Sequence, residues 1–300
     1  MVRRVDHTLQ AFAAALVAVA VLSIMDAVMK HLVIAIGIVA VSIWRAVANL
    51  IISGGLYLPR RRSWPSRKVL WIHVSRSVVV TVMAVLFFWG IGRVPLAQAI
   101  ALTFIAPLIA MVLSPLLLKE TLSGRSIAGA IAAFAGVVVI VLGQARAEVR
   151  PDVLLGIAAI LGSALCYSVN ILMMRWQALA AKPLEINFFQ SLVVMALWLA
   201  AMAIAGVPAW PHGQLVWIVV ASVLSTAGSL LFAWAYARGE ASYLAVTEYS
   251  AFLWASALGW LVFSERVSLY TLAGAVLIVG GCLIAARRRI AAPPEIDLTA

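Results

Sequence analysis

The sequence predicts an all-α integral membrane protein with ten transmembrane helices, arranged as two five-helix repeats of opposite orientation. Three observations predict it: the composition, the length of the apolar runs and an internal repeat. Of the 300 residues, 65% are hydrophobic and 11% are charged, and the mean hydropathy is +1.10. A soluble domain carries about 25% charged residues and needs a largely polar exterior. Lipid is therefore the expected solvent, and no room remains for a large extramembrane enzyme module.

Apolar runs bounded by charged residues or by Pro and Gly define the ten spans. Each run approaches the length of about 20 residues that a helix needs to cross a bilayer. Helices are expected because the backbone must satisfy its own hydrogen bonds in lipid, and the runs are too long for barrel strands. The predicted spans are 8–29, 33–58, 69–91, 97–118, 125–143, 153–175, 184–205, 214–237, 243–263 and 268–286.

The net charge of +11 raises the question of a nucleic-acid partner, which the positions of the 22 Lys and Arg exclude. They lie mostly between spans and mostly on the side of the amino terminus, which is the topogenic pattern of a membrane protein. We expect a bacterial-type cytoplasmic (inner) membrane, with both termini cytoplasmic and the first span retained. Cys166 and Cys282 fall in apolar runs without metal-ligand spacing, so no disulfide, metal or cofactor is expected.

The two halves of the chain align without a gap at an offset of 145 residues. The predicted repeats are residues 1–145 and 146–300. Each holds five spans, an odd number, so the second repeat enters the membrane from the opposite side. Such inverted repeats give a transporter two pseudo-equivalent arrangements around a site near the midplane. The matched pairs include Trp89 with Trp234, Arg93 with Arg238, Lys30 with Arg175, Glu120 with Glu265, Gly129 with Gly274 and Gly136 with Gly281.

The segment Thr103 to Val137 reads TFIAPLIAMVLSPLLLKETLSGRSIAGAIAAFAGV, with Pro107, Glu120, Gly129 and Gly136 at the spacing of an EamA domain. The chain thus resembles the ten-helix EamA branch of the drug/metabolite transporter superfamily over nearly its whole length. The resemblance implies a small-molecule substrate, since members include bacterial exporters of amino acids and other metabolites and importers of nucleotide-like compounds. It also fits a monomer or weak homodimer in the lipid bilayer.

The second repeat departs from the first at one position of this motif. Phe252 stands where Pro107 stands in the first repeat. Proline removes a helix hydrogen bond and bends the chain. We therefore expect an irregular helix in span 4 and none at the matching place in span 9.

Charged residues within spans are costly and are functional candidates by default. Asp26 and Lys30 share a helical face near the end of span 1, as a local pair or as part of a gate. Arg45 lies near the middle of span 2, where it either binds a substrate carboxylate or phosphate or is satisfied by helix carbonyls.

Arg76 in span 3 and Glu248 in span 9 lie at similar depths from the cytoplasmic ends of their spans. Spans 3 and 9 face the cavity in the resembled family, so a pair across it is expected. Because an unpaired buried charge costs several kcal/mol, two isolated ions are disfavoured. The pair is either purely structural or contacts and gates the substrate, and Glu248 is the candidate for a coupling proton.

Polar and aromatic residues complete the predicted substrate-binding cavity. Aromatic residues also pack helices together and anchor membrane interfaces, so a structural role remains an alternative to a role in the cavity. The resemblance places spans 4, 6 and 9 around the cavity. The residues assigned to it are Thr103, Phe104, Tyr167, Asn170, Tyr249 and Trp254, together with Arg76 and Glu248.

These features favour a secondary transporter that moves small polar metabolites, most readily amino acids outwards, by alternating access. Uptake or exchange of a nucleotide-like compound such as S-adenosylmethionine is the alternative within the same class. An intramembrane enzyme would need paired acids, a Ser/His couple or a metal site. His7, His31, His73 and His212 all lie at or near span ends, so the chain is not expected to be an enzyme.

Overall fold

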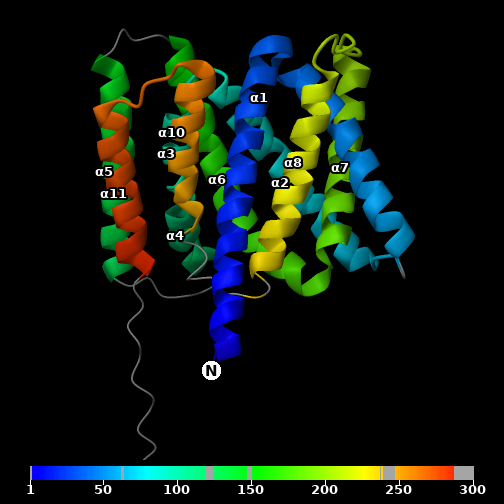
Figure 1. Ribbon diagram of the computed structural model, residues 1–300, viewed down its shortest axis with the longest axis horizontal. Helices are drawn as coiled ribbons and strands as arrows, with labels where there is room; N and C mark the ends of the chain where they lie inside the picture. The colour runs from blue at the N-terminus through cyan, green and yellow to red at the C-terminus, as the bar shows by residue number, and fades with distance from the viewer. Residues whose placement is uncertain are drawn as a thin grey trace, which may run out of the picture.

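The structure, a computed structural model, describes residues 2–61, 64–118, 124–146, 151–236, 238 and 247–286. Every regular element in these ranges is helical, and the helices stand together in one bundle (Figure 1). Five helical stretches are long and apolar enough to cross a membrane, and shorter apolar helices lie beside them. The predicted all-α membrane fold is confirmed. The elements are α1 (Val2–Tyr57), η1 (Leu58–Arg60), α2 (Arg67–Ile91), α3 (Leu96–Thr103), α4 (Ala106–Leu118), α5 (Gly124–Arg146), α6 (Pro151–Ala180), α7 (Pro183–Ala205), α8 (Leu215–Tyr236), α10 (Ser250–Phe263) and α11 (Leu269–Ala286).

Spans 1 and 2 are the two halves of α1, which breaks at Gly37. The backbone there has φ 78° and ψ 160°, a conformation that residues with a side chain rarely adopt. The predicted connection at residues 30–32 is wrong, because the helix continues through Lys30, whose charge is neutralised by a partner from another helix. We call the end of the bundle at Gly37 the far end, and the end where α1 begins the amino end (Figure 1).

Span 4 is interrupted between α3 and α4, at Phe104 and Ile105, three residues before Pro107. The predicted irregularity is therefore present. Span 9 is interrupted as well, at Tyr249, although Phe252 replaces the proline. The expectation of a regular span 9 is wrong: Tyr249 is the repeat mate of Phe104, so the break follows the repeat rather than the proline. The two rings meet edge to face, with centroids 5.3 Å apart.

Glycines bring α5 and α11 into close contact at one edge of the bundle (Figure 1). A Cβ on Gly136 would lie 2.6 Å from the carbonyl oxygen of Gly274, and a Cβ on Gly281 would lie 2.5 Å from that of Gly129. The 145-residue offset converts one of these contacts into the other. The small residues of spans 5 and 10 therefore pack within the chain, as predicted.

A second repeated contact lies at opposite ends of the bundle. The guanidinium of Arg93 stacks 3.5 Å from the ring centroid of Trp89, and that of Arg238 stacks 4.3 Å from the ring centroid of Trp234. Each arginine also donates to the carbonyl of its tryptophan. The residues between α5 and α6, 147–150, and the carboxyl-terminal tail lie outside the described residues, as does Glu120, so the repeat boundary and the cytoplasmic placement of both termini stay predictions.

We predict that Gly274→Ala destabilises the protein by about 1–3 kcal/mol, because its Cβ would meet a backbone oxygen of α5 that has no room to move. Thermal unfolding in detergent, followed by tryptophan fluorescence, measures the loss. Gly280→Ala is the matched control, since nothing lies within 4 Å of a Cβ at that position of the same helix. Equal Tm values for the two variants would contradict close packing through Gly274.

Candidate functional site

Among the described residues, polar side chains inside the bundle form three groups, and Glu248 makes a separate contact with Tyr236. Each group joins helices that are distant in sequence, and each holds at least one charged residue. We name them by position. The far-end lock is Lys30 and Glu265, the central pair is Asp26 and Arg45, and the amino-end network is Arg76, His73, Gln177, Asn170 and Glu185.

The far-end lock ties α1 to the two segments that follow α2 and α10. Lys30 is 4% exposed, and its Nζ donates to the Glu265 carboxylate and, over 2.6 Å, to the carbonyl of Val94. The second oxygen of Glu265 accepts from the backbone N–H of Leu96 at 2.8 Å. The predicted local pair between Asp26 and Lys30 does not form, because Lys30 lies inside the bundle and finds Glu265.

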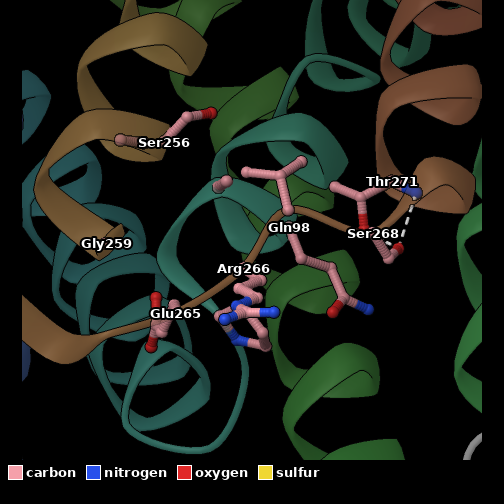
Figure 2. Close-up of a pocket in the computed structure, with 11 residues that line it drawn as sticks. Gln98, Ser256, Gly259, Glu265, Arg266, Ser268 and Thr271 are labelled. Carbon is pink, nitrogen blue, oxygen red and sulfur yellow. Dashed lines mark hydrogen bonds between the residues drawn. The ribbon is translucent and has the colours of Figure 1, made fainter. Parts of the chain in front are cut away.

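The end of α10 positions Glu265. The helix stops at Phe263, and Ser264 takes the left-handed conformation with φ 55°, which turns the chain back. Gly259 leaves room for the acid, since a Cβ there would lie 2.9 Å from Glu265 Oε2. Figure 2 shows Glu265 in the wall of a cavity of about 150 Å³ that also includes Gln98 and Ser256. The cavity lies at the far end, and Glu265 of the lock forms part of its wall.

The central pair lies about 12–17 Å from the far end, at about 1.5 Å of rise per helical residue. Asp26 and Arg45 interact electrostatically, yet these two described side chains make no direct ion pair. Arg45 Nη2 donates to Ser225 Oγ at 3.1 Å, and the guanidinium lies 5.2 Å from the ring centroid of Phe88. Arg45 Nε is buried without a hydrogen-bond partner, as is Asn49 Oδ1 one turn later. Arg45 is thus only partly satisfied.

The amino-end network is a continuous chain of hydrogen bonds through α2, α6 and α7. Arg76 Nε donates to Asn170 Oδ1 at 2.8 Å, and its Nη1 donates to Gln177 Oε1. Gln177 Nε2 lies 2.7 Å from His73 Nδ1, and His73 Nε2 lies 3.3 Å from Glu185 Oε1. His73 is fully buried and stacks on Phe189. The structure thus joins the predicted residues Arg76 and Asn170.

Arg76 and Glu248 do not form the predicted ion pair. Glu248 accepts instead from the Tyr236 hydroxyl at 2.6 Å, and Arg76 is held by α6. Tyr167 interacts electrostatically with both charged residues, so the three lie in one region. The physical reason is that amide and phenol groups at the same depth supply each charge with a nearer partner.

The remaining predicted residues divide between the interior and the surface. Phe104 and Tyr249 meet in the interior, and Thr103 Oγ1 donates to the carbonyl of Ile100 in its own helix. Trp254 is 42% exposed and lies with Leu253 and Leu261 on an exposed apolar face of α10. That face is suited to lipid contact, so the assignment of Trp254 to the cavity is not supported.

Sequence reasoning missed the lock and half of the amino-end network. Lys30 and Glu265 had a visible signal, because each repeat carries a basic residue near the end of its first span and an acidic residue after its fourth. His73 lies near a span end, which hides its burial, whereas Gln177 follows Asn170 after two helical turns on one face. Among the described residues, no group of three or more His, Cys, Asp or Glu side chains is placed to hold a metal ion.

The EamA-like transporter family matches residues 9–142 and 154–287, one segment in each half. The chain belongs to this family. An uncharacterised transporter of Helicobacter pylori strain J99 is 30% identical over 216 residues, which cover 69% of this chain and 71% of the relative. The pseudopaline exporter CntI of Pseudomonas aeruginosa strain UCBPP-PA14 is 25% identical over 275 residues, covering 89% and 92%. A solved crystal structure superposes with a TM-score of 0.60 at 22% identity, covering 94% of this chain and 99% of the other, and supports the fold.

These relatives and the family are transporters, which agrees with the composition and the absence of an enzyme motif in the sequence. The chain is therefore a multi-pass membrane transporter of the EamA-like family. Its substrate is a small molecule rather than a nucleic acid.

We predict that Lys30→Met and Glu265→Gln each destabilise the protein by about 3 kcal/mol, because each leaves a buried group without its charge partner. The double variant should lose less than the sum of the two single losses. Chemical unfolding of the four proteins in detergent gives the coupling energy. Strictly additive losses would contradict a direct interaction between the two side chains.

Proposed function

We propose that the protein exports small zwitterionic metabolites, amino acids or close derivatives, and that Asp26 and Arg45 bind the charged groups of the substrate. One observation carries the proposal: the central pair holds opposite charges inside the membrane that do not neutralise each other by direct contact. The other charged groups of the bundle interior, in the lock and in the amino-end network, have protein partners at hydrogen-bond distance.

The chemistry of the pair matches an amino acid. An unpaired charge in a membrane protein is costly, so a persistent gap between an acid and a base indicates that a ligand completes the site. Arg45 presents a guanidinium with a buried, unpartnered Nε, which suits a substrate carboxylate. The Asp26 carboxylate suits an ammonium group. One anion site and one cation site at the same depth are what a free amino acid requires.

Two features support transport by alternating access. The lock closes the far end by joining α1 to the segment after α10, and it has to open before a substrate at Asp26 and Arg45 could leave on that side. Paired helix breaks at Phe104 and Tyr249 lie at equivalent positions of the two repeats. Interrupted helices beside a central site are typical of carriers built from inverted repeats.

The direction of transport is inferred from the relative in Pseudomonas aeruginosa, which exports pseudopaline. Export across a cytoplasmic membrane agrees with the charge distribution of the sequence, which places the amino end in the cytoplasm. The substrate would then enter at the amino end and leave at the far end, past the lock.

We predict that Asp26→Asn and Arg45→Gln each raise KM for substrate exchange by about 10- to 100-fold. Each change removes a charge-assisted hydrogen bond worth about 1.5–3 kcal/mol. Counterflow in proteoliposomes loaded in turn with each of a panel of amino acids, and then with S-adenosylmethionine, measures the exchange.

Arg238→Gln is the matched control, because it removes the same charge from an exposed arginine that stacks on Trp234 at the end of α8. It should exchange substrate like the unmodified protein. Exchange of S-adenosylmethionine without exchange of any amino acid would overturn the proposed substrate class. Unchanged KM values in both central-pair variants would overturn the proposed site.

A further inference from the structure

We propose that His73 is a proton-binding site of this transporter, and that a proton bound there releases Arg76 from Gln177 so that Arg76 can bind the substrate carboxylate at the amino end, before that group reaches Arg45. The proposal adds a proton to the substrate as a ligand of the transporter. Its consequence for transport rests on the proposed function. The observation behind the proposal is which atoms donate and which atoms accept hydrogen bonds in the amino-end network.

The hydrogen bonds fix the orientation of the Gln177 amide. The guanidinium of Arg76 has only donors, so the group that faces Arg76 Nη1 must be the amide oxygen. The amide nitrogen of Gln177 therefore faces His73 Nδ1, at 2.7 Å. Because that nitrogen donates, Nδ1 must be the unprotonated, accepting nitrogen of the ring.

The same logic fixes the histidine tautomer. With Nδ1 accepting, the ring hydrogen resides on Nε2, which faces the carboxylate of Glu185 at 3.3 Å. Described contacts thus account for both ring nitrogens of a neutral imidazole. A half-turn of the ring about its Cβ–Cγ bond would place carbon atoms opposite Gln177 and Glu185, so the two contacts hold the ring in this orientation.

Protonation of His73 is incompatible with this arrangement. A proton added to the lone pair of Nδ1 gives an imidazolium with donors on both nitrogens, and the Nδ1–H then faces the Gln177 amide NH₂. Rotation of the amide by half a turn restores a hydrogen bond, because its oxygen then accepts from Nδ1–H. The same rotation turns the NH₂ group toward Arg76, so Arg76 Nη1 loses its acceptor. Arg76 keeps its bond to Asn170 and presents a free N–H edge.

The surroundings allow the proton to reach and to remain on the ring. Glu185 lies in the first turn of α7, and its side chain is 19% exposed, so it connects the buried imidazole with solvent at the amino end. The described charged or titratable groups that face the site are Glu185 from α7, Arg76 from α2 itself, Tyr57 from α1, whose hydroxyl interacts electrostatically with Glu185, and Tyr167 from α6, which interacts electrostatically with Arg76. Burial is the largest influence against the imidazolium and Arg76 adds to it, whereas Glu185 favours the charged ring. An anion bound to Arg76 would remove the part of the opposition that Arg76 contributes.

Proton binding and anion binding therefore assist each other. Linkage requires that a substrate which binds more tightly to the protonated form also promotes protonation. The affinity for the substrate carboxylate should rise as the pH falls, by up to about tenfold per pH unit, which is the limit for uptake of one proton.

The network itself is tested without substrate, by ¹⁵N NMR of the full-length protein in nanodiscs with labelled histidine and arginine. The His73 signals are those absent from His73→Asn, and the Arg76 signals those absent from Arg76→Lys. We expect the neutral tautomer with hydrogen on Nε2 at about pH 8, and a shift of the Arg76 guanidinium signals as the pH is lowered toward about 5. That shift should be absent in His73→Asn, whose amide oxygen still accepts from Gln177 but binds no proton.

Gln177→Glu provides an independent variant. Its carboxylate accepts from Arg76 and from protonated His73 at once, so Arg76 should stay bound at both pH values. His212→Asn is the matched control, because it removes an exposed histidine outside the network. The Arg76 signals of this variant should shift with pH as they do in the unmodified protein. Observation of the tautomer with hydrogen on Nδ1, or of an Arg76 shift that persists in His73→Asn, would overturn the proposal.

Counterflow of amino acids at equal internal and external pH tests the link to transport. The unmodified protein should show KM values that fall as the pH is lowered, and His73→Asn should exchange substrate with KM values independent of pH. A pH dependence that survives unchanged in His73→Asn would overturn the link. If no amino acid is exchanged by the unmodified protein, the proposed function fails, whereas the NMR result still decides whether His73 controls Arg76.

Discussion

Compensation of charge without water is the constraint on which this bundle depends. A lysine or an arginine inside a membrane protein is tolerated when carboxylates, amides or carbonyls take the place of its hydration shell. The far-end lock meets this condition completely, since Lys30 has a carboxylate and a backbone carbonyl. The amino-end network meets it with amide oxygens from Asn170 and Gln177. The central pair meets it only in part, because Arg45 has Ser225 as a partner but keeps a buried Nε without one. This difference is the basis of the proposed substrate site.

The inverted repeat relates the packing contacts of the bundle but not its described polar groups. The glycine contacts between α5 and α11 occur twice, once in each direction, and the Arg–Trp stacks at Arg93 and Arg238 occur once at each end of the bundle. The polar groups, by contrast, are not duplicated among the described residues. The lock lies at the far end and the His73 network at the amino end. The framework is therefore symmetric, whereas the chemistry along it is polarised.

The sequence predicted the framework because lipid imposes simple rules. Length and apolarity of the runs locate helices, and the repeat reveals their inverted order, so the positions of α2, α5 to α8 and α11 agree with the predicted spans to within a few residues. The connection between spans 1 and 2 was predicted at residues 30–32 rather than at Gly37, because Lys30 resembles a loop residue until its partner Glu265 is known. The prediction of a regular helix in span 9 was wrong for a related reason. Proline is a local signal, whereas the turn at Tyr249 is set by contact with Phe104.

The site was predicted less well because the tertiary structure decides which side chains form hydrogen bonds or ion pairs with one another. Arg76 and Arg45 were identified from the cost of charged groups in lipid, which depends on sequence alone, and Asn170 was assigned from the family resemblance. The partners of Arg76 and Glu248 depend on which helix faces bring an amide or a phenol closest, and Gln177 and Tyr236 were closer than the opposite charge. His73 was overlooked because distance from a span end does not report burial beneath Phe189.

The meeting of Phe104 and Tyr249 has a thermodynamic consequence. These two residues occupy equivalent positions of the repeats, so their contact maps onto itself when the two halves exchange roles. In a carrier whose two arrangements are related by such an exchange, the Phe104–Tyr249 contact is present in both arrangements. It contributes the same free energy to each, so it does not change their relative populations. The glycine contacts of α5 and α11 share this property as a set. The lock does not have this property, because the repeat relates Lys30 and Glu265 to Arg175 and Glu120. In such a carrier the lock would therefore favour one arrangement over the other, whereas the aromatic pair and the glycines would favour neither.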